Sequence, residues 1–374
     1  MKIVVLDNSI DTTGAANALN KSITEICSND LEFIFVYPSD SKNINVIKKL
    51  GFRVYPIPFV EISKRVKDLF LYFPMLIINS IRLHNLIKRE NVDIVHVNDI
   101  FNMVGLFVKL FTKVKVFTHI RRMPESFPKK LYNVWAGLHV LYSDRIIAVS
   151  EANLRALPTN SKSVVIYDPL PNEEKYPSYN PKQILNNEVK ILYLANYTKG
   201  KGHSYAIEII SRAKKEFPAF NFFLNFYGGD FGLHKNKGYK DSLRLIVETE
   251  GLQNNISFFD KAEDVEKVMK DHDVVLNLSD SESFSRVSLE ALFYGIPLIA
   301  TDVGGTNEMV LNKETGILVK PNDVLSMYNG FKQLINNDEL RRKCAMNSLI
   351  FVREKFGKQS TSFKLEEIYK TSLA

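Results

Sequence analysis

Short runs of consecutive apolar residues alternate with segments of helical periodicity along almost the whole chain. A strand that is apolar at every position is buried on both faces, as in a parallel sheet covered by helices on both sides. The alternation therefore predicts an α/β fold of doubly wound domains, whose ligands bind beyond the carboxyl ends of the strands. The predicted strands cover residues 2–6, 32–37, 53–56, 93–97, 115–118, 145–149 and 163–167, then 189–195, 220–227, 256–259, 274–278, 297–301 and 316–319.

A proline-rich stretch divides this alternation into two halves. Residues 169–183 hold four prolines, few apolar residues and no periodicity, which is typical of an interdomain linker. At 374 residues the chain is long enough for two domains, each with its own core. We therefore expect domains at 1–168 and 188–355, a linker at 169–187, and a C-terminal helix within 356–374 that packs back on the first domain.

Positive charge is concentrated in the first half. The formal net charge is +7, and residues 1–180 carry 23 Lys and Arg against 17 Asp and Glu, which leaves +1 for the remainder. This asymmetry fits an anionic partner such as a lipid-phosphate acceptor or a membrane surface, and no nucleic acid is expected. A solvated basic face without a partner fits the same counts.

The longest apolar run, residues 69–81, is too short to cross a bilayer. We expect a buried helix there, and the alternative is a helix that lies on a membrane surface. Cys27 and Cys344 are far apart, so no disulfide framework is expected and a cytoplasmic protein is the default. The N-terminal apolar run is followed at once by Asp7, which indicates a strand and not a signal peptide.

Residues 280–323 hold the most distinctive pattern in the chain. Glu282 and Glu290 flank a Ser-Phe-Ser turn that opens an apolar helix predicted over 286–293, and Ser283 or Ser285 is a plausible N-cap. The first-turn amides and the helix dipole favour an anion such as a diphosphate. Because one carboxylate precedes the helix and the other lies within it, the two suit separate sets of hydroxyls. The alternative is that Glu282 caps a helix and Glu290 is solvated.

The order of features in this stretch resembles the retaining GT-B glycosyltransferases of family 4. The Glu pair is followed by a turn at 295–297, a Gly304-Gly305 loop and Thr315-Gly316. The resemblance implies two facing Rossmann-like domains with a cleft between them, the first binding an acceptor and the second a nucleotide-sugar. It also implies transfer of a sugar to an acceptor hydroxyl with retention of configuration, with a UDP-sugar favoured and no cofactor or metal.

The resemblance also assigns roles to individual residues. His119 would contact the transferring sugar, Glu282 would hold its hydroxyls, and Glu290 would hold the ribose. Further donor-binding residues are implied around the diphosphate and the base: Gly14, Asn196, Lys201, Gly228, Lys261, Ser283, Phe284, Ser285, Arg286 and Val287.

Two departures from the family pattern stand out. Asn196 occupies the position of an arginine that clamps the donor diphosphate, and Lys199 or Arg286 is the candidate replacement. Ser283 and Ser285 stand where glycines are usual. The loss of the guanidinium keeps open a catalytically silent nucleotide-sugar-binding subunit as the alternative function, and a nucleotide-sugar 2-epimerase on the same fold is a further rival.

Asp271-His272-Asp273 matches a metal-binding pattern in letters only. Asp273 leads directly into a predicted strand and Asp271 ends the helix before it, so we expect structural roles and no metal site. A glycan or a lipid-linked precursor is the expected acceptor, and a cytoplasmic protein in peripheral contact with the membrane is the expected location.

Overall fold

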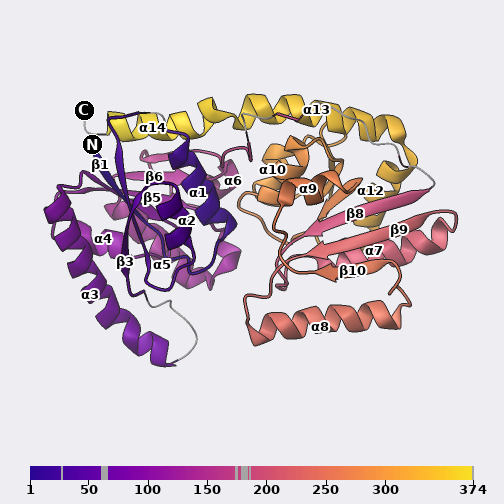
Figure 1. Ribbon diagram of the computed structural model, residues 1–374, viewed down its shortest axis with the longest axis horizontal. Helices are drawn as coiled ribbons and strands as arrows, with labels where there is room; N and C mark the ends of the chain where they lie inside the picture. The colour runs from indigo at the N-terminus through magenta and orange to yellow at the C-terminus, as the bar shows by residue number, and fades with distance from the viewer. Residues whose placement is uncertain (27, 60–65, 173–175, 178–183, 185–186, 373–374) are drawn as a thin grey trace. The chain divides into compact units, whose positions relative to one another are not determined.

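The computed structural model describes residues 1–26, 28–59, 66–172, 176–177, 184 and 187–372. In the helix at residues 66–90, side chains are described from residue 70 onward. Two compact units share the chain, as the ribbon in Figure 1 shows. Unit 1 comprises Met1–Pro169 and Lys358–Ala374, and unit 2 comprises Leu170–Gly357. Much of the predicted linker, and Cys27, lie outside the described residues.

The described part of unit 1 contains a seven-stranded parallel sheet in the order β3-β2-β1-β4-β5-β6-β7. Every strand predicted for this half is present, and the order reverses between β1 and β4, where doubly wound folds bind ligands. The strands are β1 (Lys2–Leu6), β2 (Glu32–Pro38), β3 (Arg53–Ile57), β4 (Ile94–Asn98), β5 (Lys115–Ile120), β6 (Arg145–Ala148) and β7 (Ser163–Val165).

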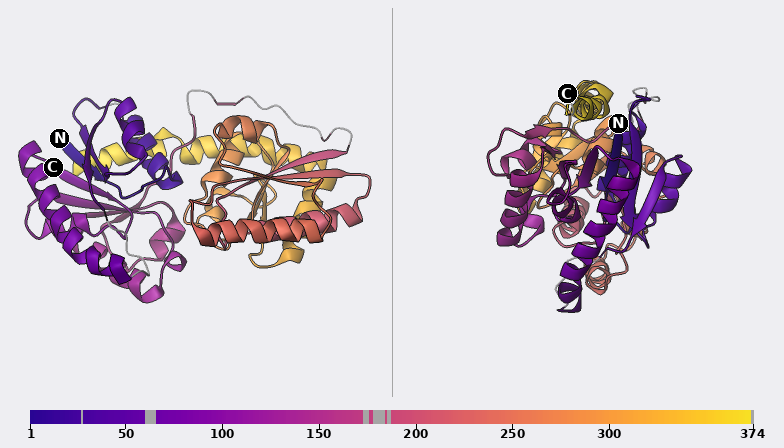
Figure 2. Two further views of the ribbon diagram at one scale, coloured as in Figure 1. Left: turned by 60° about the horizontal axis from the view of Figure 1, so that its bottom comes forward. Right: turned by 90° about the vertical axis from the view of Figure 1, so that its left-hand side faces the viewer.

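Helices cover both faces of this sheet (Figure 2). The residues of β1 and β4 are almost all buried; β1 is apolar after Lys2, whereas β4 also carries the buried polar side chains of His96 and Asn98. The helices are α1 (Gly14–Thr24), α2 (Asn43–Lys49), α3 (Val66–Glu90), α4 (Val104–Lys109), α5 (Lys129–Tyr142), α6 (Glu151–Arg155) and, from the end of the chain, α14 (Ser362–Thr371).

Unit 2 repeats the same architecture. Its described residues form a six-stranded parallel sheet in the order β10-β9-β8-β11-β12-β13, and the order reverses between β8 and β11. The strands are β8 (Glu188–Leu194), β9 (Asn221–Tyr227), β10 (Ile256–Phe259), β11 (Val274–Asn277), β12 (Leu298–Thr301) and β13 (Ile317–Val319). The prediction of two doubly wound parallel sheets is confirmed.

The helices of unit 2 also lie where the periodicity predicts them, apart from α11, a single turn that the sequence analysis missed. Residues of α7 and α8 pack on one face of the sheet, and the predicted helix over 286–293 is α10. The helices are α7 (His203–Glu216), α8 (His234–Thr249), α9 (Val265–Lys270), α10 (Arg286–Phe293), α11 (Thr306–Met309), α12 (Val324–Asn336) and α13 (Asp338–Phe356).

The C-terminal helix α14 belongs to unit 1. The ring of Tyr369 is buried and stacks on Phe117, and its hydroxyl lies 2.5 Å from Nδ1 of His96. Ser362 donates a hydrogen bond of 2.6 Å to the Glu25 carboxylate on the segment that follows α1. The end of the chain therefore completes the core of the unit in which the chain begins.

The expectation of a buried helix at residues 69–81 is wrong. These residues form a helix, as part of α3, but Phe70, Phe73 and Ile77 are exposed, while the polar residues Asn79 and Ser80 are buried. Asn79 donates a hydrogen bond to the carbonyl of Pro58, and Ser80 donates to the carbonyl of Leu76. These bonds pair the donor groups of the two polar side chains on the inner face, while Oδ1 of Asn79 has no partner among the described residues.

Candidate active site

The predicted donor site in unit 2 lies where the strand order reverses. The loop after β8 and the loop after β11 both start at the carboxyl edge of the sheet, at the position where doubly wound folds bind ligands. Asp280 donates its backbone N–H to the carbonyl of Gly200 at 2.8 Å. A backbone hydrogen bond thus joins the two loops.

Tyr193 and Gly202 fix the contact between these loops. The hydroxyl of Tyr193 donates to the carbonyl of Lys201 and accepts the backbone N–H of Leu278 at 3.2 Å. Gly202 has a φ of +74°, and a Cβ there would meet the Leu278 carbonyl oxygen at 2.1 Å. No other residue fits this approach. The sequence analysis did not identify Tyr193, and its position at the end of an apolar strand gave no signal.

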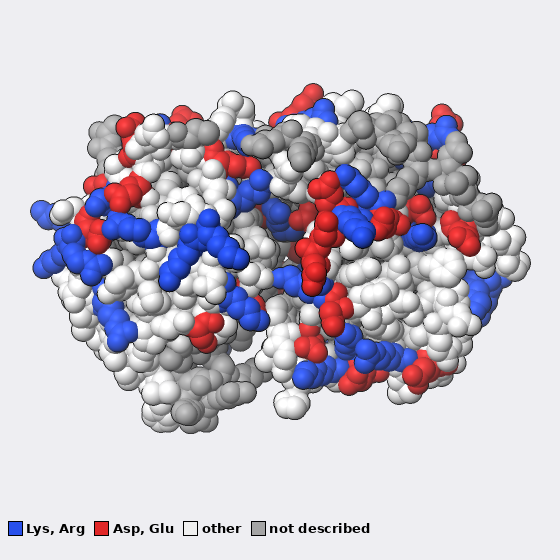
Figure 3. All heavy atoms as spheres, viewed as in Figure 1, with Lys and Arg blue, Asp and Glu red and all other residues white. Residues whose placement is uncertain are grey.

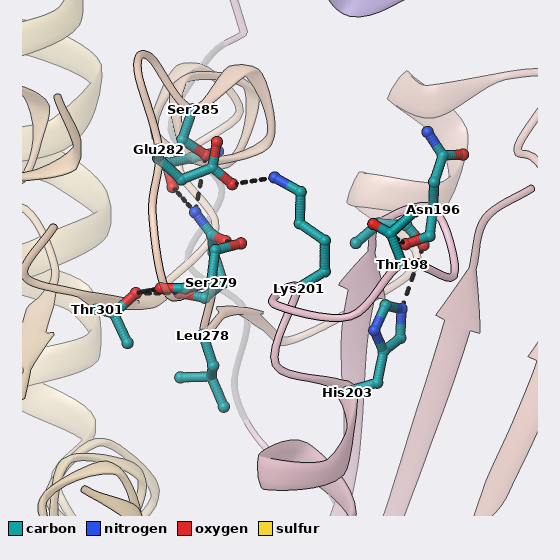
Figure 4. A network of polar contacts seen from close by, with 12 residues as sticks. Asn196, Thr198, Lys201, His203, Leu278, Ser279, Glu282, Ser285 and Thr301 are labelled. Carbon is teal, nitrogen blue, oxygen red and sulfur yellow. Dashed lines mark hydrogen bonds and ion pairs between the residues drawn. The ribbon is translucent and has the colours of Figure 1, made fainter. Parts of the chain in front are cut away.

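The fixed loops bring Lys201 to Glu282. Nζ of Lys201 lies 2.7 Å from Oε1 of Glu282, although the two residues are 81 positions apart (Figure 4). Both side chains are partly buried. The structure therefore brings together two of the residues that the sequence analysis assigned to the donor.

Gly304 and Gly305 both contact the backbone carbonyl of Glu282. Gly305 donates its N–H to the Glu282 carbonyl at 3.0 Å, and a Cβ on Gly304 would meet the same oxygen at 1.9 Å. Gly304 has a φ of +47°. The Gly304-Gly305 pair, which the sequence showed as one loop of the pattern, is thus required for close packing beneath Glu282.

Ser285 is the N-cap of α10. Its hydroxyl accepts the backbone N–H of Ser288 at 3.2 Å and the amide N–H of Asn277 at 2.8 Å. Asn277 also donates to Oγ of Ser288 at 2.9 Å. Of the two serines that the sequence offered as a cap, Ser285 is the one that fills the position, and the bonds from β11 fix where the helix begins.

Glu290 has its own cationic partner. It lies within α10 and pairs with Arg286 one turn earlier, with 3.1 Å between Oε1 and the guanidinium. Burial raises the pKa of the Glu290 carboxyl, and the nearby charge of Arg286 opposes that rise. As the spacing predicted, the two carboxylates do not share a proton or a partner.

Asn196 takes a structural part at the position where the resemblance leads one to expect an arginine. Its Oδ1 accepts the backbone N–H of Gly229 at 3.0 Å, which ties the loop after β8 to the loop after β9. Gly228 lies at the same contact, because a Cβ there would meet the Ala195 carbonyl oxygen at 1.9 Å. Lys199, one candidate for the missing cation, is exposed, and Arg286, the other, stands at the first position of α10.

The remaining predicted donor residues differ in exposure. Phe284 is buried, and its ring packs edge-on against Phe356 at 5.6 Å, so its contact in the structure is with the core. Ser283 and Val287 are half-buried. Lys261 is exposed just after β10, where the rings of Tyr227 and Phe259 stack at 4.6 Å.

The predicted residues of unit 1 lie at the carboxyl edge of its sheet. Gly14 is the first residue of α1, whose N-cap is Thr13. His119 is buried near the end of β5, and its Nε2 has no hydrogen-bond partner among the described residues. Burial, with the adjacent charge of Arg121, holds the pKa of His119 well below its usual value, so the ring is neutral at physiological pH.

The sequence analysis missed the buried charge beside His119. Arg121 donates to Asp168 at 2.6 Å and to Oδ1 of Asn98 at 2.6 Å, and its third nitrogen lies 3.4 Å from Nδ1 of His119. Asn98 in turn donates to Asp7 at the end of β1. The basic pair that follows β5 in the sequence gave no indication that one arginine is buried.

Asp271 and Asp273 have structural positions. Oδ2 of Asp273 accepts the backbone N–H of Lys190 at 2.8 Å, and Asp271 is the C-cap of α9. Among the described residues, no group of three or more His, Cys, Asp or Glu side chains is arranged to hold a metal ion.

Comparisons with known proteins agree with this geometry. The model of the family described as glycosyl transferases group 1 matches residues 178–349. The chain is 24% identical over 338 residues to N-acetyl-alpha-D-glucosaminyl L-malate synthase of Bacillus anthracis, and this aligned region covers 85% of each protein. It is 27% identical over 359 residues to an uncharacterized glycosyltransferase of Methanocaldococcus jannaschii, which covers 91% of this chain and 90% of that protein.

Solved structures with the same fold extend over the whole chain. HepE of Anabaena, crystallised with UDP and glucose, superposes with a TM-score of 0.83 at 19% identity and 99% coverage of both chains. Sucrose-phosphate synthase of Thermosynechococcus elongatus superposes with a TM-score of 0.82 at 15% identity, over 99% of this chain and 98% of that one. The chain is therefore a glycosyltransferase with the GT-B fold, and its residues 178–349 match the family of glycosyl transferases group 1.

Proposed function

We propose that the protein transfers a sugar from a UDP-sugar to an acceptor hydroxyl, with retention of configuration, in the assembly of a cell-surface polysaccharide or glycolipid. The observation that carries the proposal is the Lys201–Glu282 pair at the point where the strand order of unit 2 reverses, beside the start of α10. UDP in the crystal structures of HepE and TarM supports the choice of nucleotide.

In this proposal, donor binding rearranges the ion pairs of the free protein. The donor diphosphate attracts Lys201 away from Glu282, because two phosphate groups carry more negative charge than one carboxylate. Glu282 then accepts hydrogen bonds from the sugar hydroxyls, and the first-turn amides of α10 donate to the phosphate. The same positive groups stabilise the charge that develops on the departing UDP, so the proposal includes no metal or other cofactor.

Glu290 has a different task in the proposal. It lies one turn into α10, beyond the position of the phosphates, and would accept hydrogen bonds from the ribose hydroxyls. Arg286 would then supply the positive charge that Asn196 lacks, which requires its bond to Glu290 to loosen. His119, neutral and with an unpartnered Nε2, would contact the transferring sugar.

A thermal-shift panel tests the donor site. We expect UDP to raise the melting temperature of the wild type more than GDP, ADP, dTDP or CMP does, since a ligand that binds only the native state stabilises it by about 2.7 kcal/mol at 100 times its Kd. In Glu290→Ala the loss of two hydrogen bonds to a carboxylate should weaken UDP about 10- to 100-fold. The matched control is Glu266→Ala, which removes an exposed glutamate from a similar helical ion pair with Lys270.

Each outcome of the panel has a definite meaning. A shift by another nucleotide alone would overturn the choice of UDP, and the absence of any shift would overturn the donor site. Equal losses in Glu290→Ala and Glu266→Ala would show that the effect is not local to the site.

A catalytically silent nucleotide-sugar-binding subunit is the second candidate function. It is favoured by Asn196, whose side chain is engaged with Gly229 where a diphosphate clamp is expected. Hydrolysis of the donor without acceptor separates the two candidates. A transferase releases UDP slowly from UDP-sugar, whereas a silent subunit binds the donor and never turns it over.

A further inference from the structure

We propose that the exposed face of α3 docks on a lipid bilayer that contains anionic phospholipids. This face, called here the α3 ridge, consists of the apolar side chains of the first half of the described helix. Its members recur at intervals of three and four residues, so they lie on one side of the helix. They are Phe70, Phe73, Ile77, Ile78 and Ile81.

The α3 ridge brings several exposed apolar side chains together on one face of the helix. Single exposed apolar side chains are normal, whereas contiguous ones mark an interaction site. The ridge runs over three turns, about 17 Å at 1.5 Å per residue, and the sequence from Phe70 to Ile81 contains no charged residue. Exposed Pro74 lies within it.

The opposite face of α3 is part of the core of unit 1. Leu76, Leu83 and Leu86 are buried against the sheet in the same apolar cluster as residues of β1 and β4. By length and composition Phe70–Glu90 could span a membrane, and 33% of its most apolar window is buried inside the protein. Because this face is packed on the sheet, α3 can lie along a bilayer surface but cannot cross it without unfolding unit 1.

Positive charge adjoins the ridge and identifies the kind of surface. The next exposed positions toward the end of the helix include Arg82, Lys88 and Arg89. The acidic residue of this stretch, Glu90, is paired with Arg53 at 2.9 Å and with Arg89 at 3.2 Å. Figure 3 shows Lys and Arg side chains gathered over the end of α3 that lies uppermost there.

An apolar face followed by basic residues is the arrangement of helices that lie in the interface of a membrane. The apolar side chains enter the boundary between headgroups and acyl chains, and the basic ones bind the phosphates of an anionic surface. A second copy of this chain would cover the apolar part but would offer the basic end no complementary charge from the same face. The charge therefore favours a lipid phosphate surface.

This proposal goes beyond the glycosyl transfer and does not depend on the identity of the donor. It places the acceptor-binding half of the enzyme at a bilayer, where a lipid-linked acceptor would be reached. The UDP thermal shift can therefore be measured on the same variants as an independent control of folding and of the donor site.

Flotation with lipid vesicles tests the α3 ridge. The wild type should float with vesicles of phosphatidylcholine and phosphatidylglycerol and remain in solution with phosphatidylcholine alone. The double variant Phe73→Ser/Ile77→Ser should bind the anionic vesicles about tenfold more weakly or worse. The matched control Leu245→Ser/Ile350→Ser removes side chains of equal exposure from α8 and α13, 63% and 56% against 62% and 55%, and should float as the wild type does.

The basic residues are tested separately. Arg82→Gln/Lys88→Gln should lower binding to anionic vesicles. The binding that this variant retains should no longer depend on the salt concentration. The Phe73→Trp variant should shift its emission to the blue and be quenched by brominated lipids, while Leu245→Trp should not. These fluorescence readings hold even if the serine variants were to fold poorly.

Three results would overturn the proposal. One is undiminished flotation of Phe73→Ser/Ile77→Ser with an unchanged UDP shift. Another is equal binding to vesicles with and without phosphatidylglycerol. The third is a wild type that is dimeric by light scattering, does not float, and becomes monomeric in Phe73→Ser/Ile77→Ser, which would assign the ridge to a second copy of the chain.

Discussion

Arg121 and Asp168 form a buried ion pair at the carboxyl edge of the sheet in unit 1. Their side chains are almost fully excluded from solvent, and the distance between them is 2.6 Å. The guanidinium also reaches Asn98 and the ring of His119. Burial and the charge of this arginine together lower the pKa of His119, and the guanidinium lies beside its ring.

Removal of one partner should be far more costly than removal of both. Arg121→Leu leaves the Asp168 carboxylate buried without a counter-charge, and we expect it to lower the free energy of unfolding by about 3–5 kcal/mol. The double variant Arg121→Leu/Asp168→Leu should lose less than the sum of the two single variants, measured by urea denaturation of the four members of the cycle.

The exposed i,i+4 pair of Arg212 and Glu208 is the control for this cycle. Arg212→Leu should change stability by less than about 1 kcal/mol, because exposed ion pairs contribute little. Additive effects at Arg121 and Asp168 would contradict the buried pair as described. Chemical shifts of the His119 ring nitrogens should also change in Arg121→Leu and stay constant in Arg212→Leu.

Few of these residue contacts could have been predicted from the sequence. Lys201, Glu282 and Glu290 were predicted as donor residues because they belong to a spaced pattern. Tyr193 and Arg121 were missed, because each acts through a tertiary contact that leaves no local signature. The role predicted for His119 came from the family resemblance, and the sequence gave no indication that burial and Arg121 lower its pKa.

At the scale of elements, the loops around Glu282 depend on glycine. Gly304→Ala places a Cβ against the Glu282 carbonyl at a φ of +47°, and the backbone strain alone should cost about 1–2 kcal/mol. Glu282 must also move, and so the UDP thermal shift and the turnover of UDP-sugar should both fall. Urea denaturation and donor kinetics of the purified variant measure the two effects.

Gly137→Ala is the matched control for Gly304→Ala. Gly137 lies within α5, and a Cβ there meets nothing within 4 Å. Alanine has the higher helix propensity, so this change should raise stability by about 0.5–1 kcal/mol and leave UDP binding unchanged. A Gly304→Ala variant with wild-type UDP binding would show that the backbone beneath Glu282 need not be fixed.

Elements were easier to predict than contacts. The buried strands are mostly runs of apolar residues and each long helix repeats its apolar residues, so both can be recognised in the local sequence. The error at α3 has a physical reason. Composition counts apolar residues but not the direction in which they point. Asn79 and Ser80 lie on the inner face, where each donates a hydrogen bond to a backbone carbonyl. The short helix α11 has too few residues to show a period.

At the scale of the whole molecule, the chain ends in the unit where it begins. Unit 1 is built from Met1–Pro169 and Lys358–Ala374, so its core depends on residues that are made after those of unit 2. In the cell, the first unit cannot complete its fold until unit 2 has been synthesised. Substitutions that remove the contacts of α14 therefore test whether residues 1–169 and 358–372 are stabilised together.

The side chain of Tyr369 connects α14 to the sheet of unit 1. Its ring packs between Phe33 and Phe117, and its hydroxyl bonds to Nδ1 of His96, whose pKa burial lowers to about 3. Tyr369→Ala should lower the stability of unit 1 by about 3–5 kcal/mol through the cavity it leaves. Tyr369→Phe keeps the ring and should cost about 1–3 kcal/mol, because Nδ1 of His96 is then buried without a partner.

Hydrogen exchange resolved by peptide measures where the loss occurs. In Tyr369→Ala the amides of β1, β4 and β5 should exchange faster, while those of β8 and β11 should keep their wild-type protection, since they belong to unit 2. Tyr142→Ala removes an exposed tyrosine from α5 of the same unit and should leave both sets unchanged. Faster exchange in β8 and β11 as well would show that the two units unfold together, and unchanged exchange in β1 would show that α14 adds nothing to the core of unit 1.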